Sequence, residues 1–517
     1  MRWYSALAFF LLSTAAAAST RINFDETAMI QQSTDMETWT DIGVNNYVDV
    51  PDNVDKVFYR QIIQIEAPTP ERPNIVFILT DDMRFDQYGA FGGGHPFMET
   101  PSLDRLATEG VNFTRTYVTT PLCAPSRSSL FTGRLPSRHG IRNHNGSVRG
   151  ANEMPNGPFL LKDMKDAGYH TAFFGKWFNG KNFFGRVGAD EWIGMGQAYK
   201  PADVPWSGPE YWEWLTENVY TNMSYHKKWG GRDHSRQGYS TDILRDYTLD
   251  FIRERESATD GKPYFVFLSF LNPHNPFKPA EVNRDRYADQ TIPNYPNMET
   301  MAHSNDYVKQ CEMLLSVDEA VRQILGAIDD NTIIVFSSDN GYCHGEHNWA
   351  GKNIPWEESV GVPLFWYDPN YVAPRQSDEV VALLDVYQSF LDLAGAQPEN
   401  DGFEYSTSLL PTVYQQQPHR DEMMVMHYNS VDPTKMNFAQ IITRDYTYWE
   451  FRNGSKSLYS YDDPYQLNNL INEPAFDNVE ADMKLRLDTE LGREGATVTG
   501  NNPMPPDWDD RSWLLVP

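Results

Sequence analysis

Short, mostly apolar runs recur along the middle of the chain and alternate with amphipathic stretches. Residues 74–80 (NIVFILT), 263–270 (PYFVFLSF) and 332–336 (TIIVF) show no polar alternation, which is typical of strands buried on both faces of a parallel sheet. Between residues 314 and 328 the apolar side chains recur at alternating spacings of three and four, which predicts an amphipathic helix. This alternation of strands and helices predicts an α/β fold in which helices flank a large, doubly wound mixed sheet.

The pattern changes toward both ends of the chain and predicts further parts there. Residues 19–70 hold short alternating runs and end in a proline-containing linker, so we expect a small N-terminal β appendage. Residues 71–400 form the main α/β domain of this prediction. Beyond residue 400 the runs become shorter, and residues 401–517 are expected to form an α+β subdomain on a short antiparallel sheet. A chain of 517 residues exceeds what one hydrophobic core usually fills, which favours this division.

Residues 1–18 have the pattern of a signal peptide for export. Arg2 supplies a positive charge, residues 6–12 (ALAFFLL) an apolar segment, and residues 16–18 a small-residue cleavage site. The apolar segment is shorter than the ~20 residues that a membrane span needs, and no other segment is long and apolar enough. We therefore expect a secreted or periplasmic protein without a membrane span.

The net charge narrows the possible ligands, and the cysteine content bears on disulfide bonds. The net charge of −28 argues against nucleic acid as a partner, because nucleic acid binding requires a basic surface. An anionic substrate must therefore be attracted by a local group of positive side chains. The chain has three cysteines, Cys123, Cys311 and Cys343, too few for a disulfide scaffold of this length. Cys311 and Cys343 could pair, which would leave Cys123 as a single thiol.

Two pairs of oxygen-bearing side chains follow apolar runs directly. Asp81 and Asp82 come after the first run, and Asp339 and Asn340 follow the third. Ligands of open α/β sheets gather beyond the carboxyl ends of the strands, so adjacent oxygen donors there suggest a cation site. Taken alone, the first pair is better explained as a solvated acidic turn.

A cysteine-containing motif gives these features a common function. Residues 123–127 (CAPSR) precede residues 130–134 (LFTGR), and together they resemble the signature of type I sulfatases in the alkaline-phosphatase-like superfamily. Residues 462–470 (DDPYQLNNL) are similar to a segment near the C-termini of these enzymes, so the resemblance extends from about residue 74 to residue 470. In that family a formylglycine-generating enzyme oxidises the cysteine after translation, and the hydrated aldehyde is the nucleophile. Without the other motifs, Cys123 would be interpreted as an inert thiol.

The resemblance implies a calcium site. Its ligands would be Asp81, Asp82, the formylglycine made from Cys123, Asp339 and Asn340. Ligation by oxygen alone suits a hard cation such as Ca²⁺ better than Zn²⁺. The cation and nearby positive side chains would stabilise the charge that develops on the sulfate ester and on the leaving alcohol.

The same resemblance assigns roles to the remaining polar residues. Arg127 would steady the nucleophile, and Lys176 and Lys352, each in a Gly-Lys pair, would contact the sulfate. His274 would protonate the leaving oxygen, with assistance from Lys352, and Asp339 would deprotonate the aldehyde hydrate. One hydroxyl of the hydrate would attack sulfur, and the second would then expel sulfate and restore the aldehyde. The implied catalytic set is Cys123, Arg127, Lys176, His274, Asp339 and Lys352, and the substrate-binding set is Lys176, His274, His347 and Lys352.

Other positions depart from this pattern or have no single role in it. His347 is a candidate for the pocket wall or for a structural role, and His139 is interpreted as structural. Many family members carry a histidine where this chain has Phe178. The form Gly-Lys-x-x-Asn-Gly resembles the glucosamine-6-sulfatase-like branch, and Asn179 or another residue would replace that sulfate-binding histidine. Cys343 has no assigned role.

The substrate class follows from weaker signals. Residues 191–238 are rich in Trp, Tyr and Gly, and indole faces suit sugar rings, although packing of a surface insertion explains the aromatic residues equally well. The leading prediction is an exported, calcium-dependent sulfatase that acts on a sulfated sugar or polysaccharide. The alternatives are a phosphonate monoester or phosphodiester hydrolase of the same superfamily and a non-catalytic carbohydrate-binding relative. The presence of the nucleophile, the metal ligands and both lysines argues against the last.

Overall fold

The computed structural model describes residues 72–91, 97–143, 157–177, 189–195, 238–290, 295–298, 304–396, 405–430 and 432–498, with short strands between residues 10 and 62 and between 225 and 233. The chain divides into two compact units, Met1–Thr69 and Pro70–Pro517. Most of the predicted signal peptide, Phe178, Asn179 and most of the Trp-rich segment lie outside the described residues. The predicted division into four parts stays a prediction.

The first unit contains a small antiparallel sheet. Its four strands follow the order β1 (Phe10–Leu11), β4 (Phe58–Ile62), β2 (Thr20–Ser33) and β3 (Thr40–Val50). β2 and β3 are neighbours in both sequence and sheet, with Thr20 paired to Val50 and Gln32 to Thr40. Short alternating runs in this part of the sequence therefore correspond to strands.

The second unit is organised around one large mixed sheet. Four parallel strands form its centre, in the order β7 (His170–Gly175), β11 (Tyr264–Ser269), β5 (Asn74–Thr80) and β12 (Thr332–Ser338). Beyond β12 the sheet continues with β15 (Gly361–Tyr367), which is antiparallel to β12, and then with β6 (Val111–Tyr117), which is antiparallel to β15. The outer strands are β8 (Glu191–Met195), β9 (Tyr225–Lys227), β10 (Gly231–Asp233), β16 (Arg375–Ser377) and β17 (Val381–Ala382). The predicted mixed sheet is confirmed.

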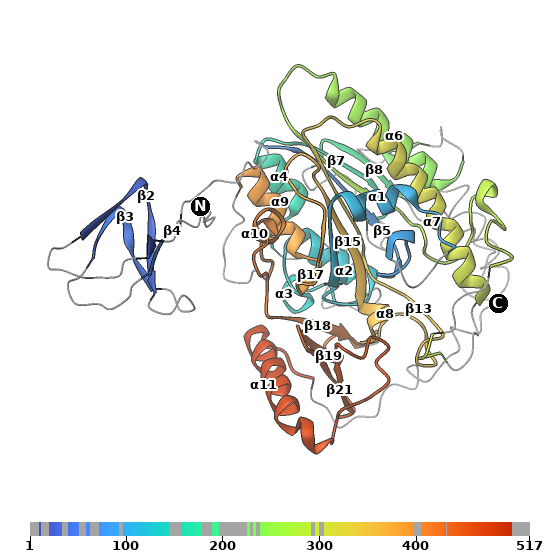
Figure 1. Cartoon of the computed structure of the whole chain (residues 1–517). Coiled ribbons are helices and arrows are strands. Elements are labelled where there is room, and N and C mark those ends of the chain that lie inside the picture. Colours follow the sequence, from blue (N-terminus) through green and yellow to red (C-terminus); the bar gives the residue numbers. More distant parts are fainter. Residues whose placement is uncertain are drawn as a thin grey trace. The chain divides into compact units, whose positions relative to one another are not determined.

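Helices cover both faces of this sheet (Figure 1). Alternate residues of β5 belong to two different hydrophobic cores. Val76 and Ile78 belong to the core formed with α1 (Pro101–Glu109), α6 (Ser240–Glu256) and α7 (Ser304–Leu325). Ile75, Phe77 and Leu79 belong to the core formed with α2 (Cys123–Thr132), α4 (Leu160–Asp166) and α9 (Asp385–Ala394). Because both faces are covered, β5 is apolar at successive positions rather than at alternate ones. The predicted doubly wound arrangement is confirmed.

A smaller antiparallel sheet forms the C-terminal part of the described chain (Figure 1). Its strands are β18 (Glu422–Tyr428), β19 (Met436–Thr443), β20 (Tyr446–Phe451) and β21 (Lys456–Ser460), and α11 (Asp477–Glu494) packs on β19 and β20. Met483, Leu487 and Leu491 give α11 a buried apolar face. The Met426 amide donates a hydrogen bond of 2.9 Å to the Thr119 carbonyl, which joins this sheet to the segment before α2.

Short elements complete the second unit. They are η1 (Gly89–Phe91), α3 (Pro136–His139), η2 (Glu281–Asn283), β13 (Cys343–His344), β14 (Ala350–Gly351), α8 (Glu357–Val360), α10 (Leu410–Gln415) and η3 (Pro474–Phe476). Cys311 and Cys343, for which a pairing was open, are both buried and free, as is Cys123. Within the described parts of the chain, no helix combines the length and the apolar character that crossing a membrane requires.

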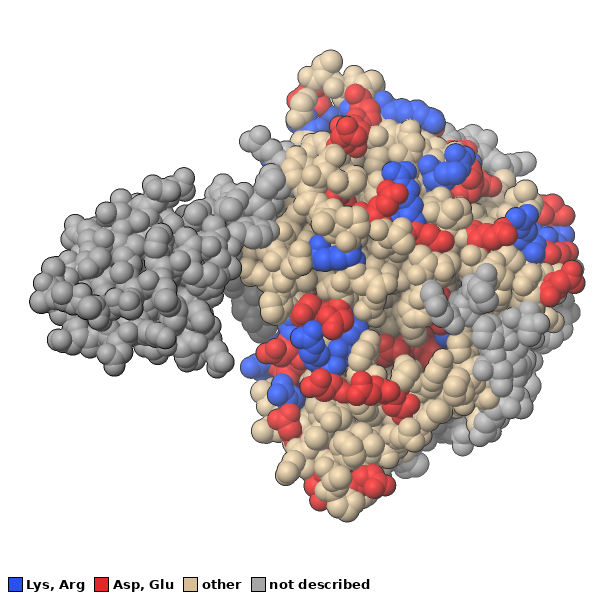
Figure 2. All heavy atoms as spheres, in the orientation of Figure 1, with Lys and Arg blue, Asp and Glu red and all other residues tan. Residues whose placement is uncertain are grey.

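Acidic and basic side chains are interspersed on the face drawn in Figure 2. Ion pairs also form within single helices, such as Arg322 with Glu319 on α7 and Arg486 with Asp482 on α11. Exposed pairs of this kind contribute little to stability, about 0–1 kcal/mol each. Because charges of both signs mix on this surface, we expect side chains inside the site to provide the attraction for an anionic substrate.

Candidate active site

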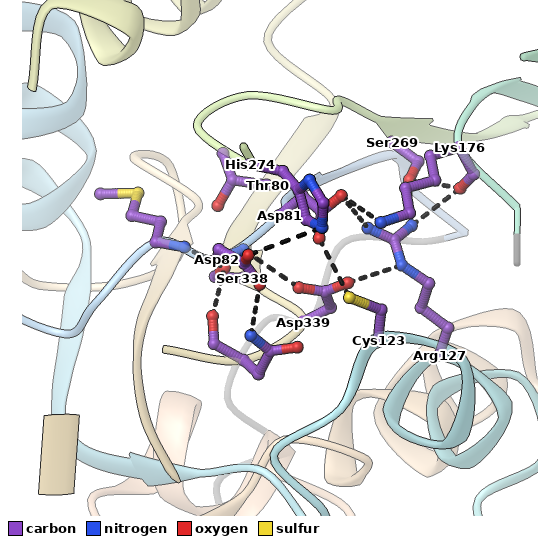
Figure 3. A network of polar contacts seen from close by, with 12 residues as sticks. Thr80, Asp81, Asp82, Cys123, Arg127, Lys176, Ser269, His274, Ser338 and Asp339 are labelled. Atoms are coloured by element: carbon purple, nitrogen blue, oxygen red, sulfur yellow. Dashed lines mark hydrogen bonds and ion pairs between the residues drawn. The ribbon is translucent and has the colours of Figure 1, made fainter. Parts of the chain in front are cut away.

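The two predicted pairs of oxygen donors meet at the carboxyl ends of β5 and β12 (Figure 3). The two strands are parallel neighbours in register, so Asp81 and Asp82 leave the sheet beside Asp339 and Asn340. The Asp339 amide donates to the Thr80 carbonyl at 3.1 Å, and the Asp82 amide donates to Asp339 Oδ1 at 3.3 Å. Asp82 has a φ of 68°, a left-handed conformation that Asp tolerates better than most residues. The structure thus brings both pairs into one cluster.

Cys123 is the first residue of α2 and is fully buried. Its Sγ lies 3.3 Å from Asp81 Oδ1 and 2.9 Å from Lys352 Nζ. Burial raises the pKa of the Cys123 thiol, and the Asp339 and Asp81 carboxylates raise it further, against the opposing effect of Lys176 and Lys352. An unmodified thiol in this place is therefore protonated at neutral pH, and a protonated thiol is a poor nucleophile.

Arg127 lies one turn beyond Cys123 on α2 and is also buried. Its Nε donates to Asp339 Oδ2 at 2.7 Å, and its Nη1 donates to the Lys176 carbonyl at 2.8 Å. Its Nη2 has no hydrogen-bond partner and lies 3.9 Å from Asp81 Oδ2. A buried donor without a partner costs free energy unless a ligand accepts from it. Arg127 therefore orients Asp339 and keeps one N–H available for an anion.

Two lysines approach the carboxylates from different segments. Lys176 follows β7 and forms an ion pair with Asp81, and Lys352 follows β14 and forms an ion pair with Asp82. Burial lowers the pKa of each lysine, but the carboxylates outweigh burial, and both pKa values lie above the usual range. Burial also raises the pKa of the Asp81 carboxyl, but Lys176 and His274 lower it more strongly, and it falls to about 2. Both lysines and Asp81 are therefore charged at neutral pH.

Two buried oxygens of the cluster have no hydrogen-bond partner, namely Asp82 Oδ2 and Asn340 Oδ1. The Asn340 side-chain nitrogen donates to Asp82 Oδ1 at 2.6 Å, which leaves the amide oxygen of Asn340 available. Ligand atoms of Asp81, Asp82, Cys123 and His274 lie within 4.8 Å of one another. Buried oxygens without a partner are costly unless a cation or water satisfies them. These donors therefore fit a hard cation.

His274 enters the cluster from the segment after β11 (Figure 3). Its Nδ1 lies 2.5 Å from the Asn275 carbonyl oxygen, so Nδ1 carries the proton in this contact. Its Nε2 faces the cluster and lies 3.7 Å from Asp82 Oδ2. Burial lowers the pKa of the His274 imidazole, although the Asp81 carboxylate opposes this.

The two other candidate histidines have different surroundings. His347 stacks on Trp356, with ring centroids 3.6 Å apart, and its Nε2 lies 3.2 Å from Asn297 Nδ2. His139 is buried, and its Nδ1 accepts the Ile141 amide at 3.1 Å. None of these contacts joins either ring to the cluster of carboxylates and lysines. The pocket role of His347 stays a prediction.

A buried ionic network near the cluster is absent from the sequence predictions. Arg84 forms ion pairs with Asp86 and Glu346, and Glu346 Oε2 accepts the His344 amide at 2.6 Å. The network joins the segment after β5 to the hairpin of β13 and β14, which leads to Lys352. No periodicity relates two residues so distant in sequence as Arg84 and Glu346. The only sequence signal for this ion pair is that Arg84 and Glu346 are charged residues in segments that are otherwise buried.

Glu358 is buried beside this network, and we expect it to make stability depend on pH. Burial, reinforced by Glu346, raises the pKa of the Glu358 carboxyl from 4.5 to about 8, although Arg84 opposes this. A raised pKa favours the protonated folded form, so the stability falls as the pH rises from about 4.5 toward 8. Glu358→Gln mimics the protonated carboxyl and should raise Tm by about 1–2 °C at pH 8, with little effect near pH 5. Thermal melts at both pH values check this, with the exposed Glu473→Gln as the control, and a Tm difference independent of pH would contradict it.

The geometry of the cluster defines a class of site. Fixed positive side chains and an oxygen cluster that fits a cation lie together at the carboxyl end of an α/β sheet. Such an arrangement stabilises negative charge on a reacting anionic ester. The fold and the site are therefore those of a hydrolase of anionic esters.

Comparisons with known proteins identify the family. Residues 73–396 match the Sulfatase family model, and residues 345–492 match the C-terminal model of N-sulphoglucosamine sulphohydrolase. An arylsulfatase of Clostridium perfringens is 28% identical, over 83% of this chain and 97% of its own length. An N-acetylgalactosamine-6-sulfatase of Rattus norvegicus is 30% identical over 75% of each chain, and an ulvan-active sulfatase of Formosa agariphila is 29% identical over 82% of each chain. The chain belongs to the sulfatase family, and the predicted class of sulfuric ester hydrolase is confirmed.

Solved structures share the fold. A protein solved in complex with its substrate D-glucosamine-2-N,6-O-disulfate matches with a TM-score of 0.68 and 21% identity, over 82% of this chain and 98% of that chain. A phosphonate monoester hydrolase of Agrobacterium radiobacter matches with a TM-score of 0.62 and 20% identity, over 82% of this chain and 96% of that chain. At these identities the likeness shows the fold alone.

Proposed function

We propose that this protein is an exported sulfatase that hydrolyses sulfate esters of a sulfated sugar or polysaccharide, using formylglycine made from Cys123 and one bound Ca²⁺. The observation that carries the proposal is the position of Cys123 Sγ, between Asp81 Oδ1 and Lys352 Nζ. Export is inferred from the pattern of residues 1–18. The substrate class is supported by relatives named as an N-acetylgalactosamine-6-sulfatase and an ulvan-active sulfatase.

The oxygen cluster would hold the cation. Asp81, Asp82, Asp339 and Asn340 would supply protein oxygens, and the modified Cys123 would supply a further one. When bound, Ca²⁺ would supply positive charge that stabilises the sulfate oxygens and the nucleophile. Asp81 is suited to this role because the low pKa of its carboxyl keeps it ionised.

Lysines and histidine would act on the ester itself. Lys176 and Lys352 are charged and buried, so they would bind sulfate oxygens and neutralise the charge that develops on them. His274 presents Nε2 to the cluster, and in its doubly protonated form it would donate the Nε2 proton to the leaving alcohol oxygen, with Lys352 in support. His347 is retained as a candidate contact to the more distant part of the substrate.

The nucleophile would be modified rather than free Cys123, since burial raises the pKa of the thiol and keeps it protonated. The hydrate of a formylglycine aldehyde would supply the attacking oxygen, and a formylglycine-generating enzyme would be the partner during maturation. Asp339 would accept the proton of that hydroxyl. Arg127 holds Asp339 Oδ2 at 2.7 Å, and would keep this base oriented toward position 123.

Hydrolysis rates on two kinds of ester test the proposal against its main alternative. We expect kcat/KM for sulfated oligosaccharides to exceed that for phosphodiesters and phosphonate monoesters by at least about 10²-fold, about 2.7 kcal/mol of differential transition-state binding. Ion chromatography of released sulfate and phosphate measures both rates on the mature enzyme. A preference for the phosphorus esters would favour the phosphonate monoester or phosphodiester hydrolase. Binding of sulfated sugar without any turnover would favour the non-catalytic relative.

A further inference from the structure

A separate cavity of about 300 Å³ lies between the edge of the large sheet and the C-terminal sheet. Its walls come from the segment after β5, from β6 and β16, from α8, and from β19, β20 and β21. None of the described residues that line it belongs to the site around Cys123. The volume is at the lower end of the range of small-molecule sites.

Arg115 on β6 gives this cavity a buried guanidinium. Its residue exposure is 2%, and its Nη1 and Nη2 donate to the carbonyls of Arg444 at 2.6 Å and Thr443 at 2.8 Å. The guanidinium carbon lies 3.5 Å from the ring centroid of Tyr461, which fixes the plane of the group. Its Nε is buried and has no hydrogen-bond partner. Arg115 therefore places a fixed positive charge on the wall of the cavity.

Two carboxyl groups on the same wall restrict the charge that a bound ligand can carry. Glu357 at the start of α8 and Asp463 after β21 both line the cavity. One Asp463 oxygen accepts the Asn468 amide at 2.7 Å. Burial raises the pKa of the Glu357 carboxyl to about 7, while Arg115 and the Tyr117 hydroxyl oppose this. Two carboxyl groups beside one guanidinium disfavour a ligand with a negative charge and provide acceptors for hydroxyl groups.

Aromatic rings form much of the remaining wall, namely Phe85, Tyr88, Phe91, Tyr117, Tyr446 and Tyr461. Tyr461 is 44% exposed, and Tyr465 and Leu467 in the following loop are 36% and 52% exposed. Apolar surface therefore continues from the cavity to the outside. Aromatic faces beside a few hydrogen-bonding groups suit a ring that is apolar on its faces and carries hydroxyl groups on its rim.

We propose that this cavity binds one uncharged pyranose ring of a saccharide. A ring hydroxyl donates to Glu357, and the sugar face packs against the aromatic wall. The ring is either a free monosaccharide or an unsulfated unit of a longer chain. This binding does not use the chemistry at Cys123, so the proposal can hold or fail independently of the proposed function.

Isothermal titration calorimetry on the full chain with Cys123→Ala tests the proposal without turnover. The probes are the methyl pyranosides of galactose, glucose and mannose, methyl β-glucuronide as a charged analogue, and an unsulfated galactan tetrasaccharide. Glu357→Gln changes one hydrogen-bond acceptor, and Gln376→Trp narrows the cavity at an exposed lining residue on β16. Gln417→Trp, which adds the same ring at an exposed position that does not line the cavity, is the matched control. Thermal melts verify that each variant is folded.

We expect at least one neutral glycoside to bind, with the glucuronide at least tenfold weaker. Glu357→Gln should weaken binding about tenfold and Gln376→Trp should abolish it, while Gln417→Trp should leave it unchanged. Tetrasaccharide binding at least tenfold tighter than the glycoside indicates a unit of a longer chain, and equal affinities indicate a free sugar. Failure of every neutral probe to bind, or binding that survives Gln376→Trp, overturns the proposal. Sugar binding in a chain whose wild type hydrolyses no sulfate ester would overturn the proposed function alone.

Discussion

The Cys123→Ala variant is expected to lose at least about 10³-fold in kcat/KM for sulfate esters, since removal of a nucleophile typically has an effect of this size or larger. Alanine removes the group that formylglycine formation requires. The two lysines and the carboxylates around position 123 remain, so the variant should still bind substrate. Initial rates of sulfate release and substrate binding, measured on the same preparation, separate the two effects.

Cys311→Ala provides the matched control for this substitution. Cys311 is also fully buried and free, but it lies on α7 in the core formed with α1 and α6. We expect this variant to lose about 1 kcal/mol of stability and to keep kcat/KM within about twofold of the wild type. If Cys123→Ala retained more than about a tenth of the activity, the assignment of the nucleophile would be wrong.

Asp339→Asn is expected to have the next largest effect, a loss of about 10²–10³-fold in kcat/KM. The substitution removes a negative charge from the proposed cation site and the proposed base, and it weakens the 2.7 Å contact with Arg127. Wild-type protein stripped of metal should gain thermal stability when Ca²⁺ is added, by about 2.7 kcal/mol at a hundredfold excess over Kd. The variant should require at least tenfold more Ca²⁺ for the same shift.

Asp318→Asn is the control for a change in a buried carboxylate. Asp318 Oδ1 accepts the amides of Ser102 and Leu103 at 2.8 Å, and an asparagine oxygen can accept the same bonds. This variant should keep both its activity and its response to Ca²⁺. Full sulfatase activity in Asp339→Asn, or an unchanged calcium requirement, would show that Asp339 is neither a ligand nor the base.

Much of the fold could be predicted because the pattern of apolar residues in the sequence matches the residues that are buried in the structure. β5 is covered on both faces, so its sequence is apolar at every position from Ile75 to Leu79, and its end could be located at Asp81. Parallel strands expose their carboxyl ends on one edge, and this explains why the pairs after β5 and β12 could be expected to meet. The placement of Cys123 and Arg127 depended on the motif of residues 123–127, because a single thiol before a helix has no specific pattern.

Other features depend on contacts that sequence does not encode locally. The ion pair of Arg84 with Glu346 and the approach of Lys352 to Cys123 join segments that are far apart in the chain. The bounds of α11 could not be predicted, because this helix buries a narrow apolar stripe and is otherwise charged. The unpaired Nε of Arg115 results from the packing of the large sheet against the C-terminal sheet, and no pattern of residues in the sequence predicts it. Such long-range arrangements require the folded structure.

Mass spectrometry of the peptide that contains Cys123 tests the central claim most directly. The protein should be produced together with a formylglycine-generating enzyme, and the fraction of peptide that carries an aldehyde should be measured beside the rate of sulfate release. The account predicts that the aldehyde is present and that the specific activity rises in proportion to its fraction. Full sulfatase activity in a preparation whose position 123 is entirely cysteine would contradict it.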